Sequence, residues 1–376
     1  MKRAVVVGLV AAGAVVAAAG VVRYDVGRID GVVLEARAAG DCAVVRAAAE
    51  RYHLVHKVVG RSAVRRSEAD VAACGRLDAA GVMLDRAVHG SERDASQGVG
   101  VLDQVLADPE QLAGVRVVVD RFVAALRVTE PCLAGRIAEE VRGRAERKEL
   151  QERIGTAIAE VGPRATSACA DELVKQADWK GARQLYQQVI ERYPDDLRVA
   201  AAKAGAQRAT EAIELADVRG LVDPDSGTYC DNPAKYSAAP PYRKGLNRTI
   251  LLGDELDPYA SRLPKAWRTS DPKAATIVVC VDVAQGKAVR TCPYQSKLGF
   301  GPVWVTFRKV VFNLKTYELR TGRLIRSGKV EVDGTSCPRR LYYQAATDFS
   351  NPEPNQFVTP TSAGLRAAFQ PTIVRR

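Results

Sequence analysis

The sequence predicts a multidomain protein with an N-terminal transmembrane helix, an all-α helical repeat domain, and a small α+β domain with an antiparallel sheet. An uncharged apolar run opens the chain. Ala, Arg, Glu, Leu and Val then recur at helical spacing, and the last third alternates apolar and polar residues as strands do. We place the leader at 1–23, the helical domain at 30–219, a linker rich in proline and glycine at 220–250, and a basic α+β domain at 251–376.

The leader is the run Ala4 to Val22, which follows two basic residues and holds 19 residues without a charge. A helix needs roughly 20 such residues to cross a bilayer, and positive charge stays on the cytoplasmic side. We therefore expect a single-pass protein of the cell membrane, with its N-terminus inside and its body extracytoplasmic. The alternative is a signal peptide cleaved near Ala17 to Ala19, after which the protein would be secreted.

The cysteines point to disulfides, because the chain has an even number of them and is expected to meet an oxidising environment. The eight are Cys42, Cys74, Cys132, Cys169, Cys230, Cys280, Cys292 and Cys337. Metal binding is disfavoured, since the chain has no CxxC pair and only three histidines. Two of these, His53 and His56, have no third ligand nearby and are interpreted as surface or half-buried residues. We expect neither a metal nor a cofactor.

The clearest pattern of the helical domain lies at 177–196. Small and large residues recur there at fixed spacing and a proline follows: Trp179, Ala182, Tyr186, Val189 and Pro194. This stretch resembles the second helix of a tetratricopeptide repeat. The resemblance implies that Ala182 lets two antiparallel helices approach, that Trp179 and Tyr186 fill the groove beside it, and that Pro194 ends the helix. It also implies a concave surface that binds another protein or a peptide.

A weaker copy of this pattern lies about 84 residues earlier, at 94–109, where the corresponding residues are Gly98, Leu102 and Val105 and the closing proline is Pro109. Two cysteines precede each copy. A duplicated unit explains both the repeated residue pattern and the repeated cysteines. Such repeats stack because one helix pair cannot bury its own apolar face. If each unit is a helical hairpin closed by its two cysteines, the expected bonds are Cys42–Cys74 and Cys132–Cys169.

Strand signals dominate the last domain. We predict strands at 276–283, 288–294, 303–319 and 323–333, and a closing helix at 362–369. The alternation in the third strand changes phase at Arg308 and Lys309, which indicates a bulge or a crossing point. Gly286 is expected in a turn between the first two strands, across which Cys280 and Cys292 would bond. Elimination then pairs Cys230 with Cys337.

The net charge of +11 belongs entirely to the residues from Asp225 onward, which hold 23 Lys and Arg against 12 Asp and Glu. The basic residues of the strands include Arg308, Lys309, Lys315, Arg320, Arg323 and Arg326. One interpretation is a sheet that binds an anionic envelope polymer, lipid head groups or nucleic acid. The other, which we favour, is a solvated face whose charge protects the sheet edges. Nucleic acid is disfavoured outside the cell.

No catalytic motif is present: the sequence holds no GxxxxGK[ST], GxSxG or HExxH, and no dinucleotide fingerprint after a strand. The charged stretch Glu139 to Arg153 is interpreted as a solvated helix face. We therefore expect no enzyme but a membrane-tethered, extracytoplasmic scaffold protein of the cell envelope, which binds a protein or peptide through its helical repeats. The alternative is an exported binder of anionic envelope polymer or ligand, acting through the basic sheet.

Overall fold

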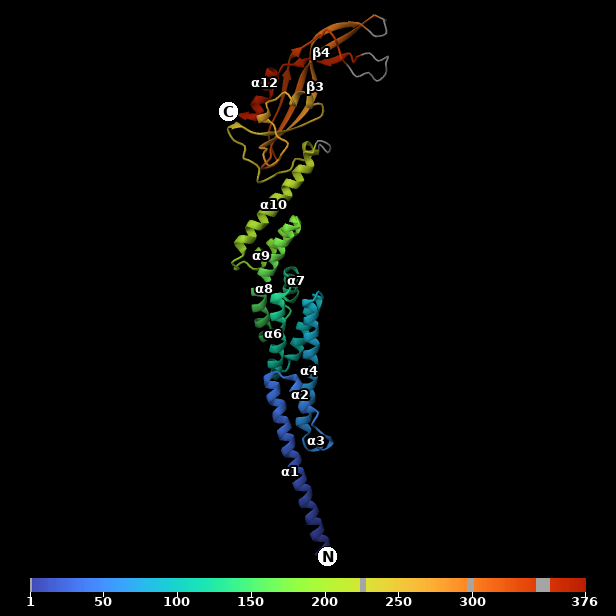
Figure 1. Ribbon diagram of the computed structural model, residues 1–376, viewed down its shortest axis with the longest axis vertical. Coiled ribbons are helices and arrows are strands. Elements are labelled where there is room, and N and C mark those ends of the chain that lie inside the picture. Colours follow the sequence, from blue (N-terminus) through green and yellow to red (C-terminus); the bar gives the residue numbers. More distant parts are fainter. Residues whose placement is uncertain (1, 224–227, 296–300, 343–351) are drawn as a thin grey trace. The chain divides into compact units, whose positions relative to one another are not determined.

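The computed structural model describes the backbone of residues 2–223, 228–295, 301–342 and 352–376, and the side chains of these ranges from residue 19 onward. The chain forms two units, residues 1–206 and 207–376. The first unit is helical and the second carries the sheet (Figure 1). A helical N-terminal region followed by a mixed α+β region with a mostly antiparallel sheet confirms the expected fold class at this level.

The first unit is a series of helices joined by short loops. They are α1 (Lys2–Ala39), α2 (Cys42–Ala49), α3 (Leu54–Val59), α4 (Arg61–Val88), α5 (Arg93–Val105), the 3-10 helix η1 (Pro109–Gln111), α6 (Leu112–Val128), α7 (Pro131–Val141), α8 (Lys148–Lys175), α9 (Trp179–Arg192) and the first part of α10 (Val199–Leu221). The boundary between the two units falls within α10.

Two long helices, α4 and α8, each pair with the shorter helix that follows them. At the pair formed by α4 and α5, a Cβ on Gly98 would lie 2.9 Å from Leu84 Cγ, so only a side chain as small as hydrogen fits there. Ala182 holds the equivalent place on α9 and is fully buried. The small residues of both sequence copies thus lie where two helices meet closely.

The main core of the first unit extends from α4 to α8 and consists of Leu, Val, Ile and Ala side chains. Among the described residues, Phe122 and Tyr193 are the only aromatic side chains buried in it. Because the side chains are small, the helices must pack closely to exclude water, which is consistent with the glycine at the contact of α4 and α5.

The predicted membrane span, Ala4 to Val22, belongs to α1, but its side chains up to residue 18 lie outside the described ones. Within the described residues, no helix is both long enough and apolar enough to cross a bilayer.

The second unit contains a five-stranded sheet with short elements around it. Its strands are β2 (Thr249–Leu252), β3 (Ile277–Gln295), β4 (Pro302–Glu318), β5 (Arg323–Val332) and β7 (Asn355–Phe357). The order is β2-β3-β4-β5, with β7 beside β4; β2 and β7 run parallel to their neighbours and the other pairs are antiparallel. Two small ribbons pair β1 (Gly245–Leu246) with β9 (Val374–Arg375) and β6 (Gly334–Thr335) with β8 (Thr359–Pro360). The helical elements are η2 (Thr228–Cys230), α11 (Asp257–Ala260), η3 (Lys265–Trp267) and α12 (Ser362–Ile373).

Residues 277–295 form one strand, so the prediction of two strands with a turn between them is wrong. Register shifts between Gln285 and Arg290 absorb the residues expected to turn. The amide of Lys287 there donates to the Glu331 carboxylate at 2.8 Å, which satisfies a backbone group that the ladder leaves unpaired. The change of phase expected on the facing strand is confirmed, because Phe307 and Val310 both enter the same core. The extra residues of this irregularity lie on β3.

Each face of the sheet has its own core. On one face, Leu365 and Phe369 of α12 pack on the sheet, with the Phe312 and Phe369 rings 5.2 Å apart. The other face is covered by the second part of α10 and by residues 228–250, whose Tyr229 and Tyr236 are buried. The stretch expected as a linker is therefore part of the second unit, because its aromatic side chains supply that core.

All eight cysteines form disulfides. The first two bonds are the expected ones, Cys42–Cys74 and Cys132–Cys169. The other two are Cys230–Cys280 and Cys292–Cys337, so the pairing predicted for these four is wrong. Cys280 and Cys292 lie on the same strand, and twelve residues of strand span about 40 Å, far beyond the reach of a disulfide. Four disulfides indicate an oxidising, extracytoplasmic location.

Candidate binding groove

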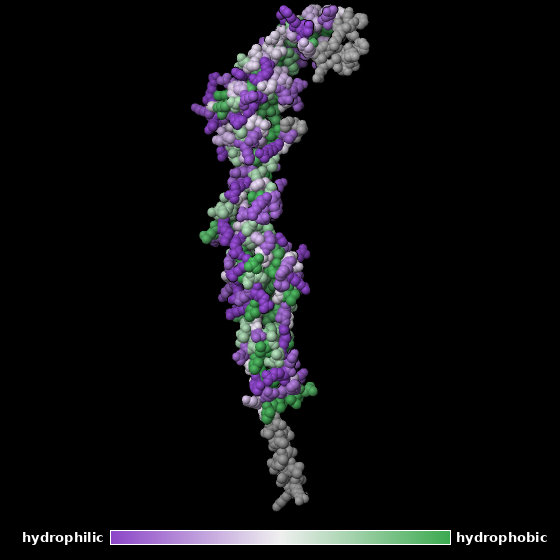
Figure 2. Space-filling model, in the orientation of Figure 1, coloured by the Kyte–Doolittle hydropathy of each residue, from purple (hydrophilic) through white to green (hydrophobic). Residues whose placement is uncertain are grey.

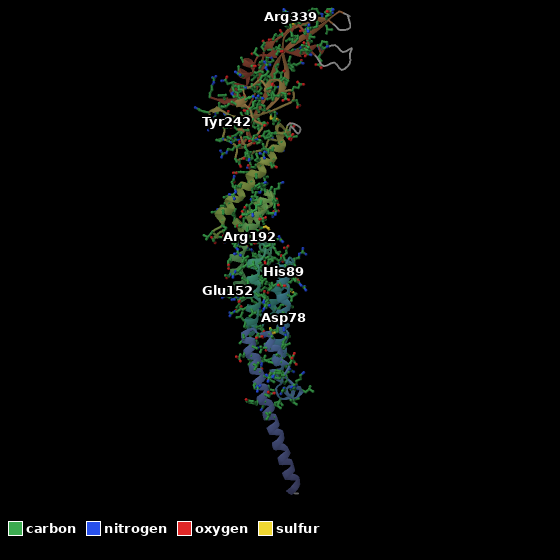
Figure 3. All side chains as sticks on the ribbon, viewed as in Figure 1. Asp78, His89, Glu152, Arg192, Tyr242 and Arg339 are labelled. Atoms are coloured by element: carbon green, nitrogen blue, oxygen red, sulfur yellow. A yellow bond between two sulfur atoms is a disulfide. The ribbon has the colours of Figure 1, made fainter. Side chains whose placement is uncertain are left out.

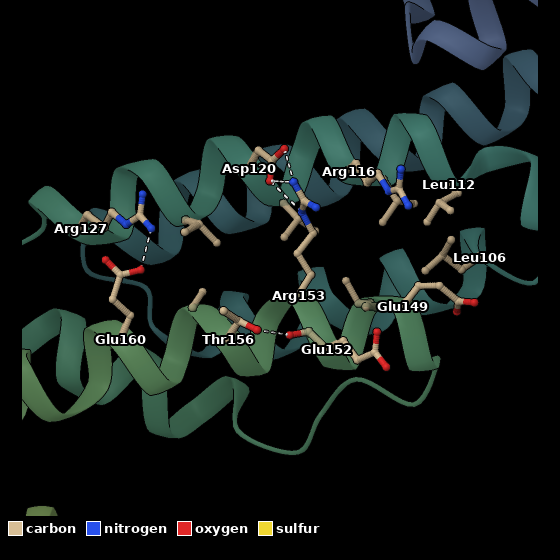
Figure 4. Close-up of a pocket in the computed structure, with 15 residues that line it drawn as sticks. Leu106, Leu112, Arg116, Asp120, Arg127, Glu149, Glu152, Arg153, Thr156 and Glu160 are labelled. Atoms are coloured by element: carbon tan, nitrogen blue, oxygen red, sulfur yellow. Dashed lines mark hydrogen bonds and ion pairs between the residues drawn. The ribbon is translucent and has the colours of Figure 1, made fainter. Parts of the chain in front are cut away.

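A groove of about 480 Å³ runs between α6 and α8 in the first unit (Figure 4). Its floor is apolar and consists of residues buried in the core: Leu106, Val115, Val119, Leu150 and Ala157. Its rims carry charged and polar side chains of both helices. Those of α6 are Arg116, Asp120 and Arg127, and those of α8 are Glu149, Glu152, Arg153, Thr156 and Glu160.

Two ion pairs cross the groove from one rim to the other. The Arg153 guanidinium donates to both carboxylate oxygens of Asp120, at 2.8 and 2.6 Å, and Arg127 pairs with Glu160 at 2.6 Å. The partners are 33 residues apart in both pairs, so α6 and α8 run in the same direction. The four side chains are between 44% and 55% exposed, and such pairs contribute about 0–1 kcal/mol each. Replacing these two ion pairs by ion pairs with a binding partner would therefore cost little free energy.

The end of the groove near Leu106 and Leu112 is not crossed by an ion pair. Arg116 stands there on α6 and Glu149 on α8 (Figure 4), and within the described residues neither forms a salt bridge. The groove therefore offers a buried apolar floor, a charge of each sign free to bind a partner, and rims that open at low cost. An amphipathic segment of another polypeptide has the matching chemistry.

The residues of the tetratricopeptide-like pattern lie on α9 and pack inward. Ala182, Tyr186 and Val189 are buried in one cluster with Ala170 of α8 and Ala202 of α10. Trp179 is half-buried at the start of α9, and Pro194 is exposed just after the helix ends. These residues hold helices together and do not line the groove between α6 and α8.

The earlier copy on α5 behaves similarly. Gly98, Leu102 and Val105 are all buried. Pro109 does not close α5 as expected, because α5 already ends at Val105. Pro109 instead begins η1, since proline lacks an N–H and has a fixed φ that suits the first position of a helix.

A second hollow of about 320 Å³ lies beside the C-terminal end of α9. There the Glu139 carboxylate accepts hydrogen bonds from Arg142 at 3.0 Å and from the Tyr193 hydroxyl at 3.2 Å, and it forms an ion pair with Arg192 at 3.0 Å; Figure 3 labels Arg192. The Arg142 guanidinium lies 4.5 Å from the centre of the Tyr193 ring. Burial raises the pKa of Tyr193 to about 12, so the hydroxyl stays a donor at neutral pH. This network fastens the end of α9 to the end of α7.

The basic residues of the sheet do not gather into one patch. Arg308 donates to the Asn355 side chain at 2.8 Å, Lys309 pairs with Asp333 at 3.4 Å, and Arg326 donates to the carbonyl of Pro371. These three are engaged by their own unit. Their contacts join β4 and β5 to β7, to the segment after β5 and to α12.

Lys315, Arg320 and Arg323 are exposed, but Lys315 stands on β4 and the other two lie at or beside the turn between β4 and β5. Arg308 and Lys315 are seven strand residues apart, which separates their backbones by about 20 Å. A group of six adjacent cations therefore does not form. Arg375 stacks on another element, with its guanidinium 4.9 Å from the ring centre of Tyr242, which Figure 3 labels.

The groove was not predicted from the sequence, although the spacing of charged residues on α6 and α8 contains a signal for it. Residues 139–153 were expected to form one solvated helix face, but α7 ends at Val141 and α8 begins at Lys148. The charges at the start of α8 then turn toward α6. Two opposite-charge pairs separated by the same 33 residues, Asp120 with Arg153 and Arg127 with Glu160, are the pattern that parallel helices produce.

The described residues contain no group of three or more His, Cys, Asp or Glu side chains arranged to hold a metal ion. Comparisons of this chain with models of known protein families, with curated proteins and with solved structures found no match.

Proposed function

We propose that this protein is a membrane-tethered, extracytoplasmic scaffold of the cell envelope, and that its helical unit binds a segment of another protein in the groove between α6 and α8. The observation that carries the proposal is the groove itself, with its buried apolar floor and its rims of mixed charge. Four disulfides support the extracytoplasmic placement, and the uncharged run Ala4 to Val22 supports the tether.

The likeness to tetratricopeptide repeats adds to this proposal. Three consecutive helices, α8, α9 and the first part of α10, pack around Ala170, Ala182, Tyr186, Val189 and Ala202. Stacked helix pairs of this kind expose long surfaces that bind partners, because each pair buries only the faces it shares with its neighbours. The helical unit would then be the part that selects the partner, with the sheet unit as a second module.

Site-specific photo-crosslinking in the native envelope tests this function. A photoreactive amino acid replaces Thr156 in the groove, and the matched control replaces Gln97, which is exposed on α5 and does not line the groove. We expect the full-length chain to form one defined protein adduct from position 156 and none from position 97. The charge reversals Arg116→Glu and Glu149→Arg should each reduce the adduct, since both residues lie at the open end.

An adduct of equal yield at both positions, or none at position 156, would contradict protein binding in the groove. The alternative function is tested in the same material by co-sedimentation with anionic envelope polymer at low and high salt. Binding that disappears at high salt and is reduced by Lys315→Glu and Arg323→Glu would favour the sheet as the binding module, because exposed charges are screened by salt.

A further inference from the structure

Exposed apolar side chains gather at one place in the first unit, which we name the α1–α3 patch. It consists of Val21 and Tyr24 on α1 and of Leu54, Val55 and Val58 on α3, and these side chains are between 55% and 80% exposed. Figure 2 shows green side chains at this end of the described surface of the unit. Isolated exposed apolar residues are normal, but five on two adjacent elements mark an interaction surface.

The α3 helix contacts α1 at Asp25 and Val26. The His56 Nε2 atom lies 3.3 Å from an Asp25 carboxylate oxygen, and the His56 Nδ1 atom accepts a hydrogen bond from the amide of His53 at 2.9 Å. Next to it, a Cβ on Gly60 would lie 2.6 Å from Val26 Cγ1, which shows how closely the end of α3 approaches α1. The α3 helix therefore lies directly beside this turn of α1.

The position of the patch along α1, relative to the end of the uncharged run, indicates which surface the patch contacts. The uncharged run ends at Val22, and Asp25 and Val26 follow three and four residues later. At 1.5 Å per residue this puts α3 about 5–6 Å beyond the end of the run. The head-group region on each side of a bilayer is about 5–8 Å thick. If the run crosses the membrane, α3 lies at the depth of the head groups.

The charge around the patch fits the same surface. Exposed cations flank it, namely Arg23, Arg28, Arg51 and Arg61. Lys57 is exposed as well and pairs with Glu68 at 4.0 Å. Of the nearby acids, Asp30 pairs with Arg66, Asp25 lies beside His56, and Glu50 is exposed. Tyr24 adds an aromatic ring of the kind that is enriched at membrane interfaces. An apolar face bordered by cations is the pattern of an interfacial helix on a bilayer that contains anionic lipid.

We propose that α3 and the adjoining turn of α1 dock on the bilayer surface as a second membrane contact, on phospholipid head groups. This proposal rests on the tether of the proposed function and extends it. Two contacts at one level restrict the tilt of α1 against the membrane, so the helical unit would be held in a defined orientation and not only kept nearby.

Lipid quenching in full-length protein tests this. All eight cysteines are in disulfides, so a single introduced thiol can be labelled selectively. The variants Val58→Cys and Val128→Cys carry an environment-sensitive fluorophore, in vesicles of phosphatidylcholine and phosphatidylglycerol with head-group spin-labelled lipid. Val128 is 86% exposed on α6, outside the patch, and is the matched control. We expect a blue shift and quenching at position 58 and neither at position 128. Adding Leu54→Asp should abolish the quenching at position 58.

The outcomes separate this proposal from the tether. Protein that floats with the vesicles while position 58 remains in water would overturn the surface contact and leave the tether intact. Protein that does not float would overturn both. A blue shift at position 58 without quenching by the spin-labelled lipid would mean that protein covers the patch, for example a second copy of this chain, and would also overturn the proposal.

Discussion

The carboxylate of Asp103 on α5 accepts a hydrogen bond from the backbone amide of Arg147, the residue that precedes α8, at 3.0 Å. It also accepts from the amide of Glu146 at 2.6 Å, and its side chain is almost fully buried. Asp103, which lies in the earlier repeat-like segment, thus fixes the point at which α8 begins in the later one. That helix supplies one rim of the groove.

Replacing Asp103 should therefore loosen the start of α8. Asp103→Ala leaves two part-buried amides without acceptors, which costs about 1–3 kcal/mol each where no water replaces the carboxylate. Asp103→Asn keeps one acceptor oxygen and should have a smaller effect. Amide hydrogen exchange of residues 146–150 in the full-length chain measures the change. Exchange rates equal to those of the unchanged protein would mean that the carboxylate does not hold this turn.

The disulfide pattern is directly testable. Peptide mapping without reduction should recover four linkages, Cys42–Cys74, Cys132–Cys169, Cys230–Cys280 and Cys292–Cys337. The double variant Cys230→Ala with Cys280→Ala should lower the stability of the second unit by about 2–4 kcal/mol, because the bond closes a long loop of the unfolded chain. Recovery of a peptide pair linking Cys280 to Cys292 would contradict the continuous strand β3.

The close approach of α4 and α5 predicts opposite effects at two glycines. Gly98→Val would push a side chain into Leu84, and we expect a loss of about 1–3 kcal/mol. Gly75→Ala on α4, where a Cβ meets no atom within 4 Å, should instead gain about 0.5–1 kcal/mol, since alanine favours a helix more than glycine does. Thermal unfolding followed by circular dichroism compares the two. A stabilising Gly98→Val would show that the two helices do not pack at this distance.

The Glu214 carboxylate predicts a pH dependence of the second unit. Burial raises the pKa of Glu214, but hydrogen bonds from Ser237 and the charge of Lys235 outweigh burial, so the pKa lies below its ordinary value. A lowered pKa in the folded state stabilises the fold above the ordinary pKa of glutamate, and this contribution disappears as the pH falls through the lowered value.

The variant Glu214→Gln should therefore lose about 1.5–3 kcal/mol at pH 7, the range for hydrogen bonds to a charged group, and little in strong acid. Hydrogen exchange of residues 236–239 at both pH values reports this difference, and Asp217→Asn, exposed on the same helix, is the control. A deficit that stays the same in acid would show that the carboxylate charge is not the cause.

Local sequence patterns predicted the elements that depend on local chemistry. The change of alternation at Arg308 and Lys309 predicted that β4 changes phase there, because a period of two puts each residue on a known face. The resemblance of 177–196 to a tetratricopeptide helix implied that Ala182 and Tyr186 pack between helices, and both are buried. The turn expected at Gly286 was wrong, since a glycine that suits a turn also suits a bulge and only the facing strand distinguishes them.

The sequence by itself determined that a helical region precedes a strand-rich one, where the charge lies, and that eight cysteines in an exported chain should form bonds. Only the tertiary structure decided which cysteines meet in the sheet unit, that Asp120 and Arg127 face Arg153 and Glu160, and that the basic residues are dispersed. The physical reason is distance along the chain. Periodicity and propensity act over a few residues, whereas partners 33 to 50 residues apart are chosen by how whole elements pack.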